Sequence, residues 1–143
     1  MRVALKMARK ARLYGEVPVG AIVVREGKIL SMAHNLTRSL NDPTAHAELV
    51  ALRRAAERLG DWRLAGCALF CTVEPCIQCA GAMLLSRVDR LVYGCADPKM
   101  GAVHSLFSLC GDPRLNHQVR VTGGVLGEEA TALMRDFFKS LRK

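Results

Sequence analysis

The spacing of apolar residues changes several times along this chain, and each change marks the start of a different predicted element. Residues 2–14 predict an amphipathic helix, because their apolar positions recur every three to four residues. The next segment, VPVGAIVV at 17–24, is short and almost continuously apolar, which is typical of a buried strand. A turn at Glu26–Gly27 leads into KILSMAH at 28–34, so we expect these two strands to form a hairpin.

The middle of the chain alternates between helical and extended patterns. A helix is predicted to begin near His46, since residues at a three- to four-residue spacing follow it. These residues are Leu49, Leu52, Arg53 and Ala56. The segment CALFCTV at 67–73 predicts a strand, residues 76–87 predict a helix, and DRLVYG at 89–94 predicts the next strand.

The last third of the chain is less regular. Residues 97–116 show no sustained pattern apart from a short turn or helix around Ser105 to Leu109. The segment QVRVTGGVL at 118–126 predicts a fifth strand, and residues 128–141 predict a final amphipathic helix. Strands that alternate with helices predict an α/β layer structure with helices on both faces of the sheet. No repeat or linker divides the chain, so residues 1–143 are expected to form a single domain.

The composition is that of a globular protein with an excess of positive charge. Half of the residues are hydrophobic, and no apolar run approaches the roughly 20 residues that a membrane span requires. The net charge is +8, which attracts phosphate groups and also favours solubility. The N-terminal segment is rich in Arg and poor in acids, as transit peptides are, but its apolar stripe continues directly into a strand. We therefore interpret it as part of the fold of a cytoplasmic protein.

The six cysteines would suit three disulfides in a secreted protein, but no signal peptide is recognisable, so thiols or metal ligands are favoured. Two of them, Cys76 and Cys79, lie in EPCIQC, thirty residues after His46 in DPTAHAE. Pro75 suits a first helical position, which puts both cysteines in the opening turn of a helix. There their sulfur atoms share one face, and the helix dipole favours thiolates. Two thiolates and one imidazole are a suitable ligand set for Zn²⁺.

Three protein ligands favour a catalytic zinc site, because structural zinc is usually bound by four. The sequence leaves open whether a fourth ligand closes the site. Taken alone, the Cys-x-x-Cys segment also suits a thioredoxin-like redox pair or a structural zinc knuckle, and a lone His46 is most simply a capping residue. If the helix begins near His46, Glu48 can reach the same cavity and act as the proton shuttle for a zinc-activated water.

The combination of His-x-Glu with Pro-Cys-x-x-Cys is the signature of the zinc-dependent base deaminases. Across nearly its whole length the chain resembles the bacterial tRNA-specific adenosine deaminases. The matching stretches are EVPVGAIVV, HN at 34–35, DPTAHAELVALR, TVEPCIQCAGAM, YG at 93–94, LNH at 115–117 and DFF at 136–138. The resemblance implies a cytidine-deaminase-like three-layer α/β/α fold with a five-stranded mixed sheet. It also implies a homodimer that converts the wobble adenosine in the anticodon of an arginine tRNA to inosine.

The resemblance further implies roles for individual residues. His46, Cys76 and Cys79 would bind one Zn²⁺ per chain, and Glu48 would be the catalytic proton shuttle. Asn35 would hydrogen-bond the flipped adenine, although the sequence by itself favours its interpretation as a turn-forming residue. The residues expected to lie along the RNA are Asp97, Lys99, Phe137 and the LNH loop at 115–117.

Two questions stay open on the sequence. We expect either Phe137 or Phe138 to be buried, because both could belong to the apolar stripe of the last helix. The function could also be that of a free-base or nucleoside deaminase acting on guanine or cytosine, since the metal motif is the same. A zinc-containing RNA-binding protein without catalysis is a further alternative, but such a protein would not need Glu48.

Overall fold

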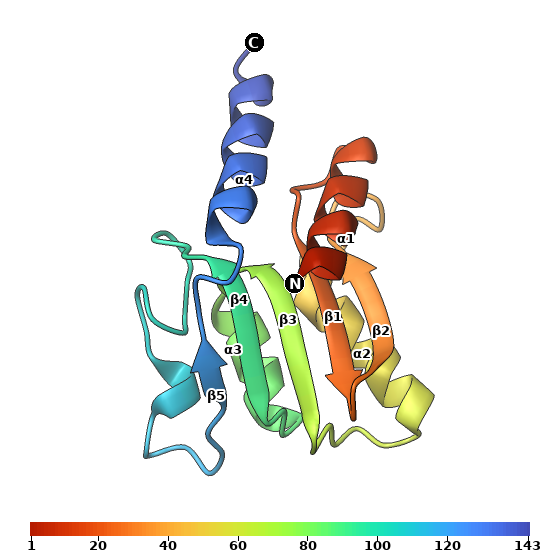
Figure 1. Cartoon of the computed structure of the whole chain (residues 1–143), viewed down its shortest axis with the longest axis vertical. Coiled ribbons are helices and arrows are strands. Elements are labelled where there is room, and N and C mark those ends of the chain that lie inside the picture. The colour runs from red at the N-terminus through yellow and green to blue at the C-terminus, as the bar shows by residue number, and fades with distance from the viewer.

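The computed structural model describes all 143 residues, which form four α-helices, one short 3₁₀ helix and a five-stranded sheet (Figure 1). The helices are α1 (Arg2–Leu13), α2 (Ala47–Leu59), α3 (Ile77–Leu85), η1 (Leu109–Gly111) and α4 (Gly127–Leu141). The strands are β1 (Gly20–Arg25), β2 (Lys28–His34), β3 (Cys67–Val73), β4 (Arg90–Cys95) and β5 (Arg120–Thr122). The predicted order of elements is confirmed throughout.

The sheet is mixed, with the strand order β2-β1-β3-β4-β5. The strand β1 pairs antiparallel with both β2 and β3, which confirms the predicted hairpin. The strands β3, β4 and β5 are parallel. Ligands of open α/β sheets bind beyond the carboxyl ends of the parallel strands, so the ends of β3 and β4 are where a site is expected.

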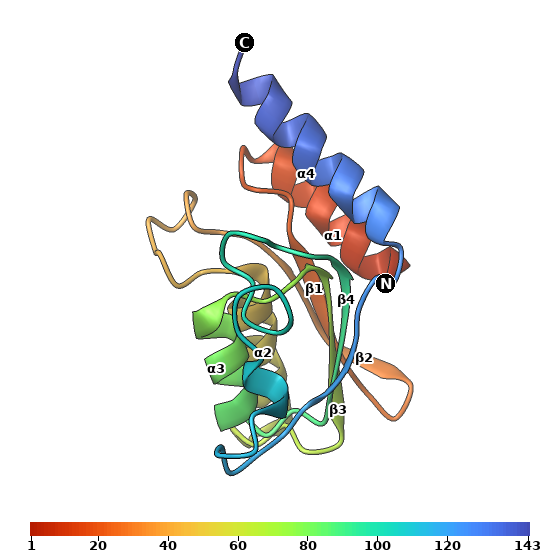
Figure 2. The same ribbon diagram turned by 90° about the vertical axis from the view of Figure 1, so that its left-hand side faces the viewer.

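The helices form two layers, one on each face of the sheet, as predicted (Figure 2). On one face α1 contacts β1 and β2, α4 contacts β4, and the two helices contact each other. On the other face α2 contacts β1 and β2, and α3 lies beside α2. The three-layer α/β/α architecture buries a hydrophobic cluster of 22 residues, whose largest fully buried members are Leu64, Leu69, Met83 and Leu91. No α-helix of the chain combines the length and apolar character needed to cross a membrane.

The first strand is shorter than predicted, because it begins at Gly20 rather than at Val17. Pro18 lies between these positions and has no N–H group to donate to a sheet. At Gly20 the backbone of α1 comes so close that a Cβ atom would overlap the carbonyl oxygen of Ala4. Residues 17–19 of the apolar run therefore form a segment that leads into the sheet, and the strand itself begins at Gly20.

Two elements in the last third also differ from the predictions. The fifth strand covers 120–122 instead of 118–126, because Gly123 and Gly124 follow it and Gly124 has a positive φ of 81°. The short helix lies at Leu109–Gly111 rather than around Ser105 to Leu109. The backbone N–H groups of 103–105 bind a buried carboxylate and are not available to a helix there.

The two helices that carry the metal motif begin at the ligands themselves. His46 is the residue before α2, with an extended backbone (φ −69°, ψ 150°). Cys76 is likewise the residue before α3, which begins at Ile77. The helix therefore starts two residues later than the predicted first helical residue, Pro75. Because backbone geometry at these positions is not yet helical, their side chains can point across the gap between the two helices.

Candidate active site

Three metal-ligating side chains meet between the starts of α2 and α3. The Nδ1 atom of His46 lies 3.5 Å from Sγ of Cys76 and 3.6 Å from Sγ of Cys79, and the two sulfur atoms are 3.7 Å apart. His46 and the first cysteine precede their helices, whereas Cys79 lies one turn into α3. The structure thus brings together the three residues that the sequence predicted.

These separations fit a zinc ion bound by two thiolates and one imidazole. With Zn–S near 2.3 Å and Zn–N near 2.0–2.1 Å, tetrahedral geometry places two sulfurs about 3.8 Å apart and a sulfur about 3.6 Å from a nitrogen. The observed values agree with both edges to within about 0.1 Å. His46, Cys76 and Cys79 are also the group of His, Cys, Asp and Glu residues whose ligand atoms converge closely enough to bind a metal.

The other histidines are engaged elsewhere, which answers the question of a fourth ligand among them. His34 bonds through Nδ1 to the carbonyl of Asn35, and His104 bonds through Nδ1 to the hydroxyl of Tyr93. His117 bonds through Nε2 to the carbonyl of Val88, at the far end of the sheet. The ligand set therefore stays at three, which is typical of a catalytic zinc site with a position left for water.

The three ligand side chains shift one another's pKa values through hydrogen bonds. The hydrogen bond between the sulfur atoms of Cys76 and Cys79 is the main cause that lowers the pKa of Cys76 to about 4, and His46 adds to the effect. The hydrogen bond with Cys76 also raises the pKa of His46. The hydrogen bond with Cys76 and burial both raise the pKa of Cys79. His46, Cys76 and Cys79 would bind a metal ion as a neutral imidazole and two thiolates, so metal binding would be coupled to proton release.

Glu48 lies in the first turn of α2 and is 4% exposed. Burial raises the pKa of its carboxyl group to about 7, although the positive charge of His46 opposes the shift. A carboxyl group with a pKa near the operating pH can both accept and return a proton. Glu48 and His46 line the same pocket.

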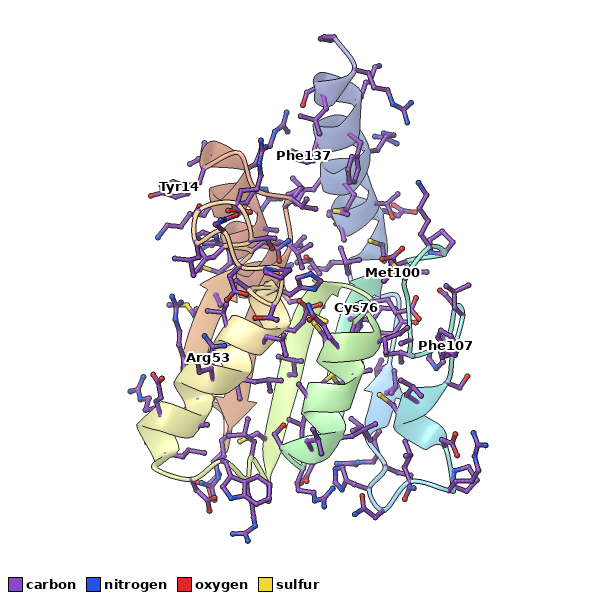
Figure 3. The ribbon with its side chains drawn as sticks, turned by 180° about the vertical axis from the view of Figure 1, so that it is seen from behind. Tyr14, Arg53, Cys76, Met100, Phe107 and Phe137 are labelled. Carbon is purple, nitrogen blue, oxygen red and sulfur yellow. The ribbon has the colours of Figure 1, made fainter.

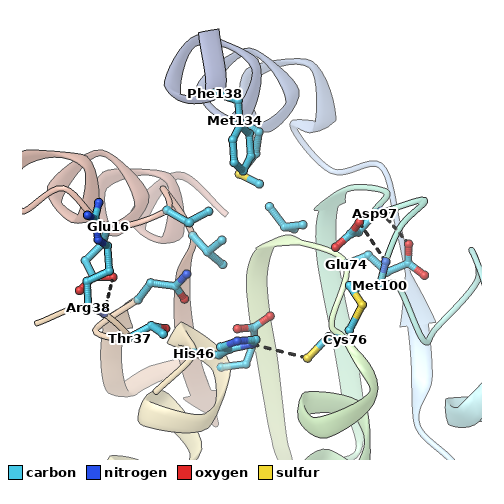
Figure 4. A pocket seen from close by; sticks show the side chains of 15 residues that line it. Glu16, Thr37, Arg38, His46, Glu74, Cys76, Asp97, Met100, Met134 and Phe138 are labelled. Carbon is cyan, nitrogen blue, oxygen red and sulfur yellow. Dashed lines mark hydrogen bonds between the residues drawn. The ribbon is translucent and has the colours of Figure 1, made fainter. Parts of the chain in front are cut away.

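The pocket next to the metal ligands has a volume of about 350 Å³, at the lower end of the range of small-molecule sites (Figure 4). One wall comes from the segments before β1 and after β2 and includes Val17, Asn35 and Arg38. The opposite wall comes from the loop after β4 and from α4, with Met100 and Phe138. Apolar side chains thus face each other across the pocket, while the metal ligands and Glu48 occupy one end.

Asn35 connects this wall to the start of α2. Its Oδ1 atom accepts a hydrogen bond of 2.8 Å from the backbone N–H of Ala47, and the residue is 8% exposed. Because the oxygen is used by the helix, the amide NH₂ is the group of Asn35 that remains to donate to a ligand. The sequence could not reveal this cap, since twelve residues separate the two partners.

Two buried carboxylates, which the sequence analysis did not single out, organise the two sides of the pocket. Glu16 accepts hydrogen bonds from the backbone N–H of Arg38 and from both N–H and hydroxyl of Ser39. Glu74 accepts bonds from the backbone N–H groups of four loop residues and from one hydroxyl. The residues that donate to Glu74 are Asp97, Val103, His104 and Ser105.

Hydrogen bonding keeps both carboxylates ionised despite their burial. Burial alone would raise the pKa of Glu74, but its donors outweigh burial and lower the pKa to about 2. For Glu16 the same competition, with donors from Ser39 and Arg38, also lowers the pKa. The position of Glu74 directly before the Pro-Cys segment is the only sequence signal that could have indicated it.

The remaining predicted substrate residues occupy different environments. Asp97 lines the pocket, and its Oδ1 accepts the backbone N–H groups of Lys99 and Met100. Lys99 is exposed and lines the groove that continues from the pocket along α4. Phe137, the residue named from the sequence, is 5% exposed and belongs to the core, whereas Phe138 is 44% exposed and lines the pocket. One of the two phenylalanines is thus buried, as expected. The prediction that Phe137 contacts the substrate is not met, because Phe138 is the phenylalanine that lines the pocket.

The LNH loop also lies apart from the pocket. Asn116 bonds to the guanidinium of Arg87, and His117 bonds to the backbone just before β4. This is the amino end of β4, whereas the pocket lies beyond its carboxyl end. Within one chain, the loop does not contribute to the pocket.

Comparison with known proteins agrees with this geometry. Residues 1–95 match the model of the cytidine and deoxycytidylate deaminase zinc-binding region. The chain is 48% identical to the tRNA-specific adenosine deaminase of Aquifex aeolicus, over 99% of this chain and 93% of that protein. It is 46% identical to the enzyme of the same name from Bacillus subtilis, over 100% of this chain and 89% of that one.

A solved structure supports the fold as well. A chain from a study of A-to-I editing by tRNA:A34 deaminases at the wobble position is 43% identical and superimposes with a TM-score of 0.90. The match covers 93% of this chain and 96% of that chain. With its one zinc site of His46, Cys76 and Cys79, the chain belongs to the cytidine and deoxycytidylate deaminase family and, within it, to the tRNA-specific adenosine deaminases.

Proposed function

We propose that this chain hydrolyses adenosine to inosine at the wobble position of a tRNA anticodon. The observation that carries the proposal is the placement of Glu48, buried beside three metal ligands at one end of a pocket with two apolar walls. A protein that only binds RNA has no use for a buried carboxyl group whose pKa is raised to about 7. A hydrolytic deaminase needs such a group to move protons.

The chemistry requires two proton transfers, and one carboxyl group can perform both. Glu48 takes a proton from the attacking water and delivers it to N1 of adenine, which makes C6 more electrophilic. The C6–O bond forms and gives a tetrahedral intermediate. Glu48 then transfers the second proton of the water to the amino group. The C6–N bond then breaks, ammonia leaves, and the carboxylate is regenerated. Zinc, when bound, supplies the water with a lowered pKa.

RNA is favoured over a free base because of the surface beside the pocket. The exposed cations of the last helix and its end are Arg135, Lys139, Arg142 and Lys143. Phe138 presents a partly exposed ring among them, and aromatic rings next to cations suit single-stranded nucleic acid. A small free base would gain little from these charges. An anticodon loop offers bases that can be splayed out into a pocket.

Three contacts to the RNA follow from the placement of the side chains. The amide NH₂ of Asn35 is free to donate to the flipped adenine, because its oxygen is engaged by α2. Lys99 lies where it can approach a phosphate in the groove beside α4. Asp97 acts through its loop, since its Oδ1 is occupied by backbone N–H groups. Phe138, rather than the Phe137 expected from the sequence, offers a ring on which a base of the RNA can stack.

The experiment that tests this function is nucleoside mass spectrometry after incubation of the purified protein with a pool of tRNA. We expect inosine at the wobble position of an arginine tRNA and no conversion of free adenosine, guanine or cytosine. Deamination of a free base at a comparable kcat/KM would favour the small-molecule deaminases instead. Binding of RNA without any inosine would favour a zinc protein that lacks catalysis.

We also infer a homodimer in a reducing, cytoplasmic environment. Four apolar side chains are exposed on α3 and in the loop before η1, namely Ile77, Leu85, Leu106 and Phe107. Figure 3 shows Phe107 on this loop. The helix α3 carries no charged residue, which is typical of a surface covered by a partner. None of the six cysteines forms a disulfide. Light scattering should give twice the chain mass for the wild type and a single chain mass for Leu85→Glu. A monomeric wild type at micromolar concentration would contradict the dimer.

A further inference from the structure

The helix α1 has an unusual distribution of charge for which the proposed reaction has no use. It carries five cations, Arg2, Lys6, Arg9, Lys10 and Arg12, and no acidic residue. By contrast, α3 has no charged residue at all, and α2 combines Arg with Glu. Among the four helices, α1 therefore has the largest excess of positive charge.

The cations of α1 have no anionic partner in the structure. The two ion pairs of the chain join Arg114 to Asp112 and Arg135 to Asp136, so neither involves α1. Arg2, Lys6 and Arg9 are exposed and recur at four- and three-residue intervals, which places like charges next to each other on one helix face. Such neighbours destabilise an isolated helix, and an external anion would remove that cost.

A groove runs along this face of the helix. It has a volume of about 310 Å³ and lies between α1 and the start of α4. Arg2, Lys6 and Arg9 line it together with Leu5, Leu126 and one acidic residue, Glu129. Three cations against one carboxylate leave the groove positive, and its open shape suits an extended polyanion.

A membrane surface is a poor partner for this helix, although basic amphipathic helices often bind one. The apolar face of α1, formed by Ala4, Leu5, Ala8 and Ala11, is buried against the sheet. The exposed face that contains Arg2, Lys6 and Arg9 is charged, and Leu13, at the very end of α1, is the one large apolar side chain of the helix that is exposed. One terminal leucine does not make the apolar face that a helix needs to insert among lipids. The charged face of α1 is therefore better suited to a polyanion that binds through charge alone.

The position of the groove connects it with the substrate. The helix α4 borders the groove through Leu126 and Glu129 and borders the active-site pocket through Met134 and Phe138. The helices α1 and α4 lie side by side on one face of the sheet (Figure 2). We infer that Arg2, Lys6 and Arg9 form a second phosphate-binding surface, which holds the RNA backbone at a distance from the nucleotide being deaminated. This inference rests on the proposed function, because the RNA it binds is the substrate.

The inference is tested by the salt dependence of tRNA binding. In the variant Arg2→Gln, Lys6→Gln, Arg9→Gln, the side chains keep a good helix propensity and lose their charge. Each lost phosphate contact should reduce the slope of log K against log salt by about 0.7–0.9, or about 2–3 for three contacts. KM for tRNA should rise with kcat unchanged, because the groove does not touch the reacting base.

A matched control distinguishes the effect of where the cations lie from the effect of the net charge of the protein. Lys28, Arg90 and Arg120 are exposed cations at the end of the sheet opposite the pocket, and their triple Gln variant has the same net charge. We expect its slope and KM to remain close to those of the wild type. The double variant Arg2→Lys, Arg9→Lys should also keep the wild-type slope, because it preserves charge.

Equal losses in the groove variant and the control would overturn the inference, since the effect would then reflect net charge alone. An unchanged slope in the groove variant would overturn it as well. Binding of the wild type to vesicles of anionic lipid that is lost in the groove variant, with tRNA binding unaffected, would assign the surface to membranes instead. Absence of inosine with the wild type would refute the proposed function, whereas normal deamination with an unaffected groove variant would refute only this inference.

Discussion

The side-chain oxygen of Asn35 accepts a hydrogen bond of 2.8 Å from the backbone N–H of Ala47. One residue thereby stabilises the start of α2, which positions His46 and Glu48, and turns its own NH₂ group towards the pocket. The amide oxygen of Asn35 thus stabilises the start of α2, whereas the amide nitrogen of the same residue is the proposed donor to the base.

Substitutions of Asn35 can separate these two contributions. Asn35→Asp keeps an oxygen for the N–H of Ala47 and adds a negative charge at a helix N-terminus, so stability should be retained. It replaces the NH₂ donor with an acceptor, so turnover of RNA should fall sharply. Asn35→Ala should lose both functions, with a stability cost of about 1 kcal/mol for the missing cap. Thermal unfolding and single-turnover kinetics measure the two effects, and wild-type turnover in the Asp variant would exclude the proposed contact.

Removal of a metal ligand should empty the zinc site. Cys76→Ala takes away one of two sulfurs that lie 3.7 Å apart, so we expect loss of zinc and a lower melting temperature. Cys110→Ala is the control, because Cys110 is buried in the core outside the cluster and should not affect the metal. Elemental analysis of both variants decides the matter. A full equivalent of zinc in Cys76→Ala would show that this assignment is wrong.

Glu48→Gln should abolish turnover and leave the rest of the site intact. Glutamine has the size of glutamate, so zinc content and affinity for RNA should stay at the wild-type level. It cannot accept and return a proton, and loss of general acid–base catalysis reduces rates by about 10²–10⁴-fold. Inosine formation under single-turnover conditions measures the reduction. If the rate fell by less than tenfold, another group would have to serve as the shuttle.

Glu74→Gln should disturb the far wall of the pocket without removing the metal. The amide cannot accept at both ends, so one of its five hydrogen bonds becomes a clash between donors, at a cost of about 1–3 kcal/mol. We expect a raised KM for RNA, because the loop that carries Asp97 and Met100 loses its anchor. Ser105→Ala removes only the hydroxyl bond and should have a smaller effect. Equal KM values in all three proteins, with only the melting temperature lowered, would leave Glu74 a purely structural role.

The two adjacent phenylalanines should respond differently to truncation. Phe137→Ala removes a ring that is 5% exposed and should lower the free energy of unfolding by about 3–5 kcal/mol. Phe138→Ala removes a ring at the pocket, so stability should change little while the affinity for RNA falls by the loss of about 1–3 kcal/mol of stacking. Denaturant unfolding and RNA binding distinguish the two. The reverse pattern would restore the role that the sequence assigned to Phe137.

The sequence by itself determined the order of elements and the metal ligands. Periodicity of apolar residues is a local property, so alternating helices and strands were recognisable without any knowledge of contacts. The ligands were equally recognisable, because thiolates three residues apart and a histidine two residues before a glutamate combine local spacing with specific chemistry. For the same reason Glu48 could be assigned before its burial was known.

Only the tertiary structure decided which other residues form the pocket. Glu16 and Glu74 receive their hydrogen bonds from residues 22 to 31 positions away, and such separations leave no pattern in the sequence. The choice between Phe137 and Phe138 depended on which side of α4 faces the sheet, and an amphipathic stripe with two adjacent aromatic rings leaves that rotation undetermined. Short-range spacing specifies the reacting groups, whereas the shape around them arises from long-range contacts that form only when the layers pack.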